Sequence, residues 1–268
     1  MSTQQAPAHA PELERRSIFE RILVGVDGTE ESLDACRQAA RLAEPQALLE
    51  AANVSLFPPA AARALGVYDL AERLERTATT ALSAAAQILG PRAELRRLEG
   101  LTVETILEEA KRVQATLLAI GTHGHARLEE IVLGGVAGEL LHKAPCAVLV
   151  ARPVPDTSTF PHDIVVGIDG SDEAEHAFEV ACSLATRRHS TLRSFVARGG
   201  KRVALGEIAN RHPHVHALTA APVPALAEAS STADLLVVGS RGLHGVRALG
   251  SVSERVAHQA ACSVLVVR

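Results

Sequence analysis

Tryptophan is absent from this 268-residue chain, and aromatic residues make up only 2% of it. Proteins that bind unpaired nucleic acid stack the bases on aromatic side chains and neutralise the phosphates with lysine and arginine. The formal net charge here is -4, so neither requirement is met. The composition therefore argues against nucleic acid as a partner and gives no electrostatic reason to expect an acidic membrane surface.

The chain also lacks long apolar runs and paired cysteine motifs. No run approaches the roughly 20 apolar residues of a membrane-spanning helix, and the N-terminal segment has no apolar core of the kind found in signal peptides. The four cysteines show no Cys-x-x-Cys spacing, so we expect buried, reduced thiols and neither a disulfide nor a metal site. These absences predict a cytoplasmic protein with a disordered tail over residues 1–19 and no membrane partner.

What the sequence does contain is an internal repeat. The segment RILVGVDGTEES recurs later in the chain as DIVVGIDGSDEA, so that Asp27 matches Asp169 at an offset of 142. Each copy has a short, continuous apolar run, typical of a strand buried on both faces, followed by an alanine-rich helical pattern. A second pair of matching segments, 115–152 and 233–268, closes the two copies.

Strands and helices alternate through both copies, which predicts right-handed crossovers and a mostly parallel sheet in each. We expect two α/β domains, 20–152 and 163–268, joined by a proline-bearing linker at 153–162. In the first domain, Ala61–Leu89 predicts one long amphipathic helix.

The second domain is abridged. Its spacing from Asp169 to Gly239 is 24 positions shorter than the matching spacing in the first domain, and the loss falls where the long helix would be. Near this place His212, His214 and His216 alternate, so on a strand they would share one face. With no cysteine or carboxylate beside them, they favour an exposed edge strand over a metal site.

Glycines mark the ends of two predicted strands. Gly25 and Asp27 follow the first strand, and Gly121 and Gly124 follow the fourth. Doubly wound sheets bind ligands outside the carboxyl ends of their strands, where glycine lets the backbone approach a ligand or adopt a positive φ. Gly134 then opens a helix whose free N–H groups favour an anion. Together these are the parts of a phosphate cradle with a carboxylate for a ribose, although glycine-rich turns also precede helices that bind no ligand.

The spacing within these segments resembles a known family. Gly-x-x-Gly, nine residues, and then glycine with a hydroxyl residue is the signature of the universal stress proteins, and the resemblance to their tandem type covers Arg21 to Arg268. It implies two Rossmann-like, doubly wound domains in tandem, each with a five-stranded parallel sheet in the order 3-2-1-4-5. Many members bind ATP in the cleft between strands one and four, whereas others bind no nucleotide. Neither half contains the Walker pattern, so P-loop chemistry is not expected.

Carried over to the first domain, the resemblance implies a set of nucleotide-binding positions. Val54 would meet the adenine edge, and the helix that starts at Gly134 would meet the phosphates. The family's two hydroxyl positions are occupied by Gly135 and Ala137, so two side-chain donors to the terminal phosphates are missing. The implied residues are Gly25, Asp27, Val54, Gly121, His123, Gly124, Gly134, Gly135 and Val136.

The second domain departs from the family in the opposite way. It keeps both hydroxyl residues, but only seven residues, 243–249, separate Gly242 from Gly250, so the loop is two residues short. We match Val196 to Val54 of the first domain. The corresponding weaker candidates are Asp169, Gly239, Gly242, Gly250, Ser251 and Ser253.

These features predict a cytoplasmic stress-response protein with an ATP- or adenine-nucleotide-type cleft in its first domain, and leave Mg²⁺ open as an accompanying ion. The alternative is a nucleotide-free module that acts through an unknown protein partner or through oligomerisation. An enzyme is not expected, because no lysine braces the phosphates and Asp27 is the sole candidate base, so ATP hydrolysis would be very slow at most. By the strand order that the resemblance implies, CAVLVA and CSVLVV are apolar edge strands, so we expect the domains to pair through them as an internal pseudo-dimer, with a homodimer left open.

Overall fold

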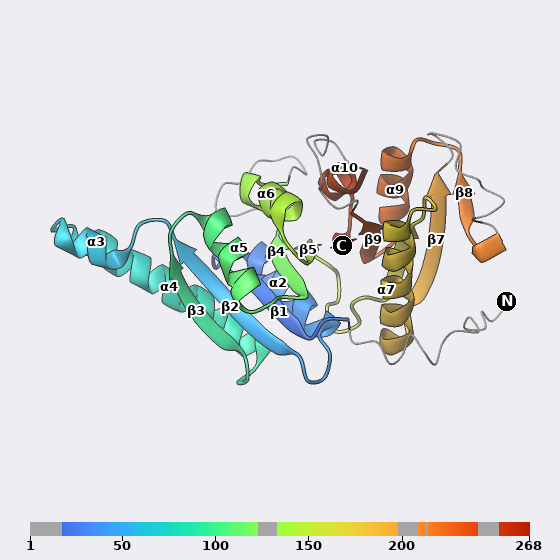
Figure 1. Cartoon of the computed structure of the whole chain (residues 1–268). Helices are drawn as coiled ribbons and strands as arrows, with labels where there is room; N and C mark the ends of the chain where they lie inside the picture. Colours follow the sequence, from blue (N-terminus) through green and yellow to red (C-terminus); the bar gives the residue numbers. More distant parts are fainter. Residues whose placement is uncertain (1–17, 123–132, 198–207, 209, 213, 241–251) are drawn as a thin grey trace.

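The computed structural model describes residues 18–122, 133–197, 208, 210–212, 214–240 and 252–268. Within these ranges the strands form one ten-stranded sheet in the order β3-β2-β1-β4-β5-β10-β9-β6-β7-β8 (Figure 1). The strands are β1 (Arg21–Gly25), β2 (Leu48–Ser55), β3 (Glu94–Glu99), β4 (Leu117–Gly121), β5 (Ala147–Ala151), β6 (Asp163–Gly167), β7 (Thr191–Ala197), β8 (His216–Leu218), β9 (Leu235–Gly239) and β10 (Ser263–Val267). The helices are α2 (Glu30–Leu42), α3 (Pro59–Ala64), α4 (Tyr68–Leu89), α5 (Thr102–Arg112), α6 (Gly135–Lys143), α7 (Asp172–Arg188), α9 (Pro222–Ser230) and α10 (Val252–Gln259).

The sheet consists of two copies of one topology. The first half reads β3-β2-β1-β4-β5 and the second reads β8-β7-β6-β9-β10, which is the same 3-2-1-4-5 order. Neighbouring strands within each half are parallel. The predicted fold, two doubly wound α/β units in tandem, is therefore confirmed.

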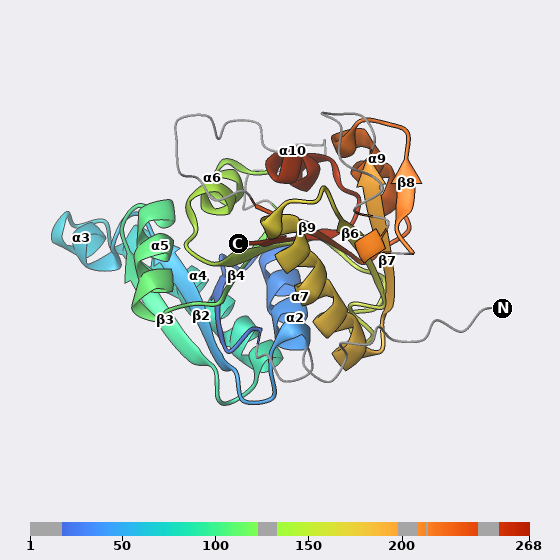
Figure 2. The same cartoon turned by 45° about the vertical axis from the view of Figure 1, so that its right-hand side comes forward.

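Helices cover both faces of the sheet. α2, α4 and α7 pack on one face, and α5, α6, α9 and α10 pack on the other. α2 and α7, one from each half, contribute to one apolar cluster on the same face (Figure 2). Both present small side chains to the strands, since Ala35 and Ala39 of α2 and Ala177 and Ala181 of α7 are fully buried. The alanine-rich composition thus lets these helices approach the sheet closely.

The prediction of one helix over Ala61–Leu89 was wrong. The segment forms α3 and then α4, and Gly66 lies between them with a φ of +73°. A left-handed residue cannot continue a right-handed helix, so the chain turns there. α3 therefore projects beyond the sheet, at the far left of Figure 1.

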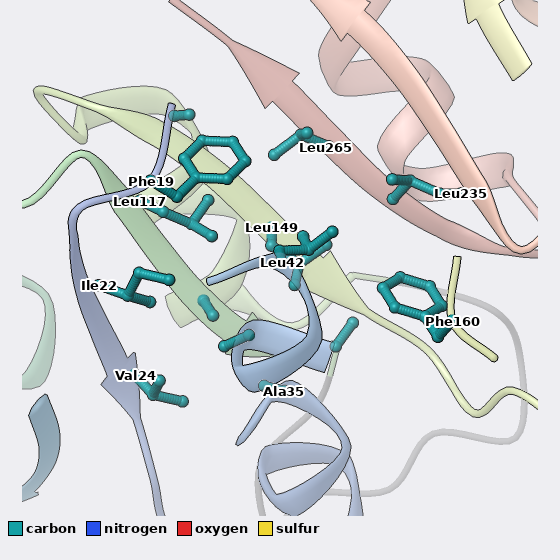
Figure 3. Packing of buried hydrophobic residues seen from close by; sticks show 14 of the residues in the cluster. Phe19, Ile22, Val24, Ala35, Leu42, Leu117, Leu149, Phe160, Leu235 and Leu265 are labelled. Atoms are coloured by element: carbon teal, nitrogen blue, oxygen red, sulfur yellow. The ribbon is translucent and has the colours of Figure 1, made fainter. Parts of the chain in front are cut away.

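The two halves join through β5 and β10. These strands pair antiparallel, with Leu149 opposite Leu265, and every residue of both strands is buried. The pairing that we predicted from the two apolar edge strands is confirmed. Leu149 and Leu265 belong to a single apolar cluster that also takes in Leu235 of the second half and Ile22 of the first (Figure 3).

Two arginines, one at the end of each joining strand, cross this junction in opposite directions. Arg152 follows β5 and donates to the carbonyl oxygens of Ala257 at 2.7 Å and Cys262 at 3.2 Å in the second half. Arg268 follows β10 and donates to the carbonyl oxygen of Leu141 in the first half. Burial lowers the pKa of both guanidinium groups. Each half thus supplies a donor to the last helix of the other.

Segments that we assigned to the tail and the linker contribute to the core. Phe19 is only 2% exposed, although we placed it in the tail, and Phe160 of the 153–162 linker is fully buried (Figure 3). Residues 1–17 of the predicted tail lie outside the described ranges. The linker is therefore packed against both halves through a large apolar side chain.

The expected histidine strand is also wrong in part. β8 is a short edge strand, but it contains only His216 of the three histidines. His212 lies before the strand, buried, with its Nε2 2.8 Å from Glu175 and its ring edge-on to Phe178. The three side chains therefore do not share a strand face.

Two buried carboxyl groups and an exposed arginine tie α5 to β2. Arg112 of α5 reaches both Glu50 of β2, at 2.6 Å, and Glu109, at 2.9 Å. Burial, followed by the neighbouring Glu109 carboxyl, raises the pKa of Glu50 to about 7. The Arg112 guanidinium lowers the pKa of Glu109. Glu50 is thus the member of the cluster that the fold prefers to keep neutral.

We predict that a charge placed in the β5–β10 junction strongly destabilises the folded protein. Val148→Asp or Val264→Asp would bury an unpaired carboxylate and lower the free energy of unfolding by about 3–5 kcal/mol. Leu48→Asp is the matched control, because Leu48 is 70% exposed and should tolerate the charge. Denaturant unfolding measures all three variants; midpoints for the two valine variants equal to that of the control would contradict the pairing.

A second prediction concerns pH. Because the pKa of Glu50 is higher in the folded protein than its ordinary value of 4.5, ionising it costs stability as pH rises from about 4.5 through 7. Glu50→Gln removes that ionisation, so it should raise the melting temperature at pH 8 relative to wild type and give no such gain at pH 5. Glu104→Gln, at an exposed position of α5, is the matched control for the loss of a carboxyl group. A gain for Glu50→Gln at pH 5 that equals or exceeds the gain at pH 8 would contradict the prediction.

Candidate functional site

The carboxyl ends of β1 and β4 lie next to each other in the first half. β1 pairs with β2 on one side and β4 on the other, all parallel, so Gly25 and Gly121 end at the same edge of the sheet. Helix α6 begins beside this edge, since the N–H of Gly134 donates to the carbonyl oxygen of Thr122 at 2.8 Å. The structure therefore brings together the first-strand, fourth-strand and helix positions that we selected from the sequence.

Asp27 lies in the turn that starts α2. Its Oδ1 accepts the N–H of Thr29 at 3.0 Å and the hydroxyl of Thr29 at 2.6 Å. Thr29 in turn caps α2 by accepting the N–H of Ser32. The carboxylate is thus held in a fixed place at the strand end, and part of its role is to order this turn.

Gly121 has a packing role that the sequence did not reveal. A Cβ at this position would lie 2.7 Å from the carbonyl carbon of Glu31 and 2.8 Å from its oxygen, in the first turn of α2. Only glycine allows the end of β4 to approach the helix this closely. The glycine is therefore explained by the contact between strand and helix, and by itself it does not indicate a ligand.

No residue within the described ranges covers the start of α6. Gly134 is the N-cap and makes no side-chain capping bond, whereas α2 is capped by Thr29. A Cβ on Gly135 would meet no atom within 4 Å, and Val136 is 45% exposed. Ala137, the other position that lacks the expected hydroxyl, is buried in an apolar cluster. Backbone N–H groups of a first turn attract anions, so the residues present fit a phosphate group here.

The end of β2 holds one functional candidate and one residue that the sequence reading missed. Val54, the predicted adenine contact, is half-buried and packs toward α5 and α6. The neighbouring Asn53 is buried, and its side-chain amide donates to the carbonyl oxygen of Val26 at 2.8 Å. Asn53 thereby fixes the backbone just before Asp27. An asparagine between the apolar residues of AANV, within a predicted strand, was the available signal.

Other chemistry is limited in the part of the chain that the structure describes. Within these residues no group of three or more histidine, cysteine or acidic side chains is placed to hold a metal ion. Burial raises the pKa of Cys36, Cys182 and Cys262 to about 12 and that of Cys146 to about 11, so the thiols stay protonated. No described helix is long and apolar enough to cross a membrane. Predicted site residues 123, 124, 242, 250 and 251 lie outside the described ranges.

Comparison with known proteins identifies the family. A family model described as the universal stress protein family matches residues 18–152 and 197–268. The chain belongs to the universal stress protein family.

Relatives share this two-domain organisation over their length. A universal stress protein of Mycolicibacterium smegmatis is 31% identical over 294 aligned positions, which cover 92% of this chain and 96% of the relative. Universal stress protein Rv2623 of Mycobacterium tuberculosis is 29% identical with the same coverage. The crystal structure of a universal stress protein from Archaeoglobus fulgidus superposes with a TM-score of 0.69 at 20% identity, covering 94% of this chain and 98% of that one.

In this universal stress protein the second half repeats the strand-end turn of the first. Oδ1 of Asp169 accepts the N–H of Ser171 at 3.0 Å and its hydroxyl at 2.5 Å. A Cβ on Gly239 would lie 2.4 Å from the carbonyl oxygen of Glu173, so Gly239 has the same packing role as Gly121. Ser253 is buried within α10. Asp169 and Gly239 thus maintain the fold whether or not a ligand binds.

The match of Val196 to Val54 was off by one position. Gly25 lies opposite Ala52 on β2, and its counterpart Gly167 lies opposite Phe195 on β7. Counting along both strands from there, Val54 corresponds to Ala197, and Val196 corresponds to Asn53. The second half therefore places an apolar, buried side chain where the first half has the amide of Asn53.

The second half also replaces α4. In the first half, Ala81 of α4 lies against Gly28, with its Cβ 3.3 Å from a Cβ built there. At the equivalent Gly170, the nearest atoms belong to Ile208, at 3.5 Å. Ile208 forms a small apolar cluster with Ile168 and Val196. Among the described residues, Ile208 of the abridged segment thus takes the place against the turn glycine that Ala81 of α4 takes in the first half.

Two glycine substitutions should have opposite effects. Gly121→Ala places a methyl group against the backbone of Glu31 and should lower the free energy of unfolding by about 1–3 kcal/mol. Gly135→Ala meets open space within a helix, so it should raise the free energy of unfolding by about 0.4–1 kcal/mol. Chemical unfolding of both variants checks the pair; a destabilised Gly135→Ala with an unaffected Gly121→Ala would contradict this account of the site.

Proposed function

We propose that this universal stress protein binds an adenine nucleotide at the carboxyl ends of β1 and β4 in its first half, and acts as a cytoplasmic stress-response protein. The observation that carries the proposal is the first turn of α6 beside those two strand ends, which no side chain of the described residues caps or covers. The resemblance of the glycine spacing to nucleotide-binding members of the family supports the adenine nucleotide as the ligand class.

Each part of the site would have a separate role. The N–H groups of Gly135 and Val136 would donate to phosphate oxygens, and the helix dipole would favour their negative charge. Asp27, fixed by Thr29, would accept a ribose hydroxyl. The half-buried Val54 would contact the base.

The site would bind phosphate groups more weakly than in family members that have hydroxyl side chains at both of these positions. Glycine at 135 offers no side-chain donor, and Ala137 is buried among apolar residues. A hydrogen bond to a charged group contributes about 1.5–3 kcal/mol, and 1.4 kcal/mol is tenfold in affinity. We therefore propose that the site holds ATP with reduced affinity. Mg²⁺ stays a proposal as its companion ion.

The same features argue against rapid hydrolysis. The first turn of α6 contains no lysine to brace a leaving phosphate. Asp27, the candidate base, already accepts two hydrogen bonds from Thr29. We propose that the protein binds nucleotide without rapid turnover, at rates below the roughly 1 per second that is typical of slow enzymes.

Titration calorimetry with ATP and AMP tests the proposed site. Asp27→Ala should weaken binding by about tenfold or more, through loss of a hydrogen bond to a charged acceptor. Asp169→Ala is the matched control, because Asp169 makes the same turn in the second half. The control should bind as wild type does.

Three outcomes would contradict the proposal. Weaker binding in the Asp169 variant alone would place the nucleotide in the second half. Phosphate release at 1 per second or faster, abolished by Asp27→Ala, would show an enzyme. No binding by the wild-type protein would favour the second candidate function.

That second candidate is a nucleotide-free module that binds a protein partner or a second copy. The observation in its favour is a corner of exposed apolar side chains where α3 meets α4: Leu65 is 70% exposed, Tyr68 is 64% and Val67 is 46%. Monomeric proteins seldom expose apolar groups together unless the surface is used. The titrations above separate the two functions.

A further inference from the structure

The second half reaches the helix that carries the proposed phosphate site. The guanidinium of Arg268, the residue after β10, donates to the carbonyl oxygen of Leu141 in the last turn of α6. In sequence the two residues are 127 positions apart. The C label, which marks the end of the chain, lies below α6 in Figure 2.

This contact completes the end of α6. The last carbonyl groups of a helix have no partner within it and need donors from outside. The N–H of Ala144 donates a hydrogen bond to the carbonyl oxygen of Leu140 at 2.9 Å, and the guanidinium of Arg268 donates one to the carbonyl oxygen of Leu141. Because Leu140 and Leu141 are both buried, water cannot easily replace a lost donor.

The two ends of α6 are mechanically linked. A helix rises 1.5 Å per residue, so the nine residues of α6 span only about 13 Å. A guanidinium at the carboxyl end also matches the helix dipole, whose positive end lies at Gly135. A contact that holds α6 in place at Leu141 therefore also sets the position of the first-turn N–H groups of α6 relative to β1 and β4.

We propose that Arg268 is a positioning residue: through Leu141 it holds α6 so that the first-turn N–H groups of the first half meet the phosphate of the nucleotide. The inference rests on the proposed function. It assigns to the abridged half a role in the binding site of the complete half, without any contact with the ligand.

The chain supplies its own control. Arg152, after β5, makes the reciprocal contact with Ala257 in the last turn of α10, at 2.7 Å. Ala257 occupies in α10 the place that Leu141 occupies in α6, because each lies 11 positions before the arginine that ends its copy of the repeat. Loss of Arg152 therefore removes a similar junction contact but releases the helix of the second half.

The experiment compares AMP with adenosine by titration calorimetry on the full chain. Arg268→Ala should weaken AMP binding by about fivefold to tenfold, as expected when hydrogen bonds to phosphate are misaligned, and leave adenosine unchanged. Arg268→Lys keeps a donor and should restore AMP binding in part. Arg152→Ala should bind both ligands as wild type does.

Two results would overturn the inference while the proposed function stands. These are equal losses of AMP and adenosine affinity in Arg268→Ala, and a loss of AMP affinity in Arg152→Ala as large as in Arg268→Ala. Both would mean that the arginines only stabilise the junction.

If the wild-type chain binds neither ligand, the proposed function fails, and amide hydrogen exchange still tests the link. Arg268→Ala should speed exchange in α6 up to its first-turn end and leave α10 protected, and Arg152→Ala should do the reverse. Exchange in α6 that is unchanged by Arg268→Ala would overturn the inference.

Discussion

The antiparallel pairing of β5 with β10 is the interaction on which the rest of this structure depends. Each strand would otherwise be the apolar edge of a five-stranded sheet, and an exposed apolar edge invites aggregation. Pairing buries Val148 and Val264 completely, and on each face of the sheet one large apolar cluster spans both halves. Arg152 and Arg268 then satisfy helix carbonyls across the junction. The two halves of this universal stress protein are therefore one folded body.

That pairing explains how one half could be cut down without losing the fold. β6, β9 and β10 keep their places in the sheet, and Ile208 fills the space against Gly170 that Ala81 of α4 fills in the first half. Among the described residues, the second half has no counterpart of α4 or of the Asn53 amide, which pack against the strand-end turn of the first half. We propose that the two halves have different roles. The first half binds the nucleotide, and the second half positions α6, the helix that contacts the phosphate.

The sequence was sufficient for the repeat, because continuous apolar strands and turn glycines are local signals. The strand order, and with it the two edge strands that form the junction, followed from the resemblance to the family. The sequence was insufficient where a residue acts on a distant partner. Gly121 looked like a ligand contact, but it is explained by the backbone of Glu31. Arg152 and Arg268 are easily recognised in the sequence as the last residues of the two copies of the repeat. The carbonyl oxygens that accept their hydrogen bonds, however, lie 105 and 127 positions away. Gly66 divides a segment whose helical periodicity is otherwise unbroken, and periodicity does not report the φ of one residue.

The most direct test of these different roles of the two halves is a crystal structure of the full chain grown with AMP. The account predicts one nucleotide per chain, with its phosphate at the first turn of α6 and its ribose beside Asp27, and no nucleotide at Asp169. A nucleotide bound at the strand ends of β6 and β9, in place of the first-half site or in addition to it, would contradict the account.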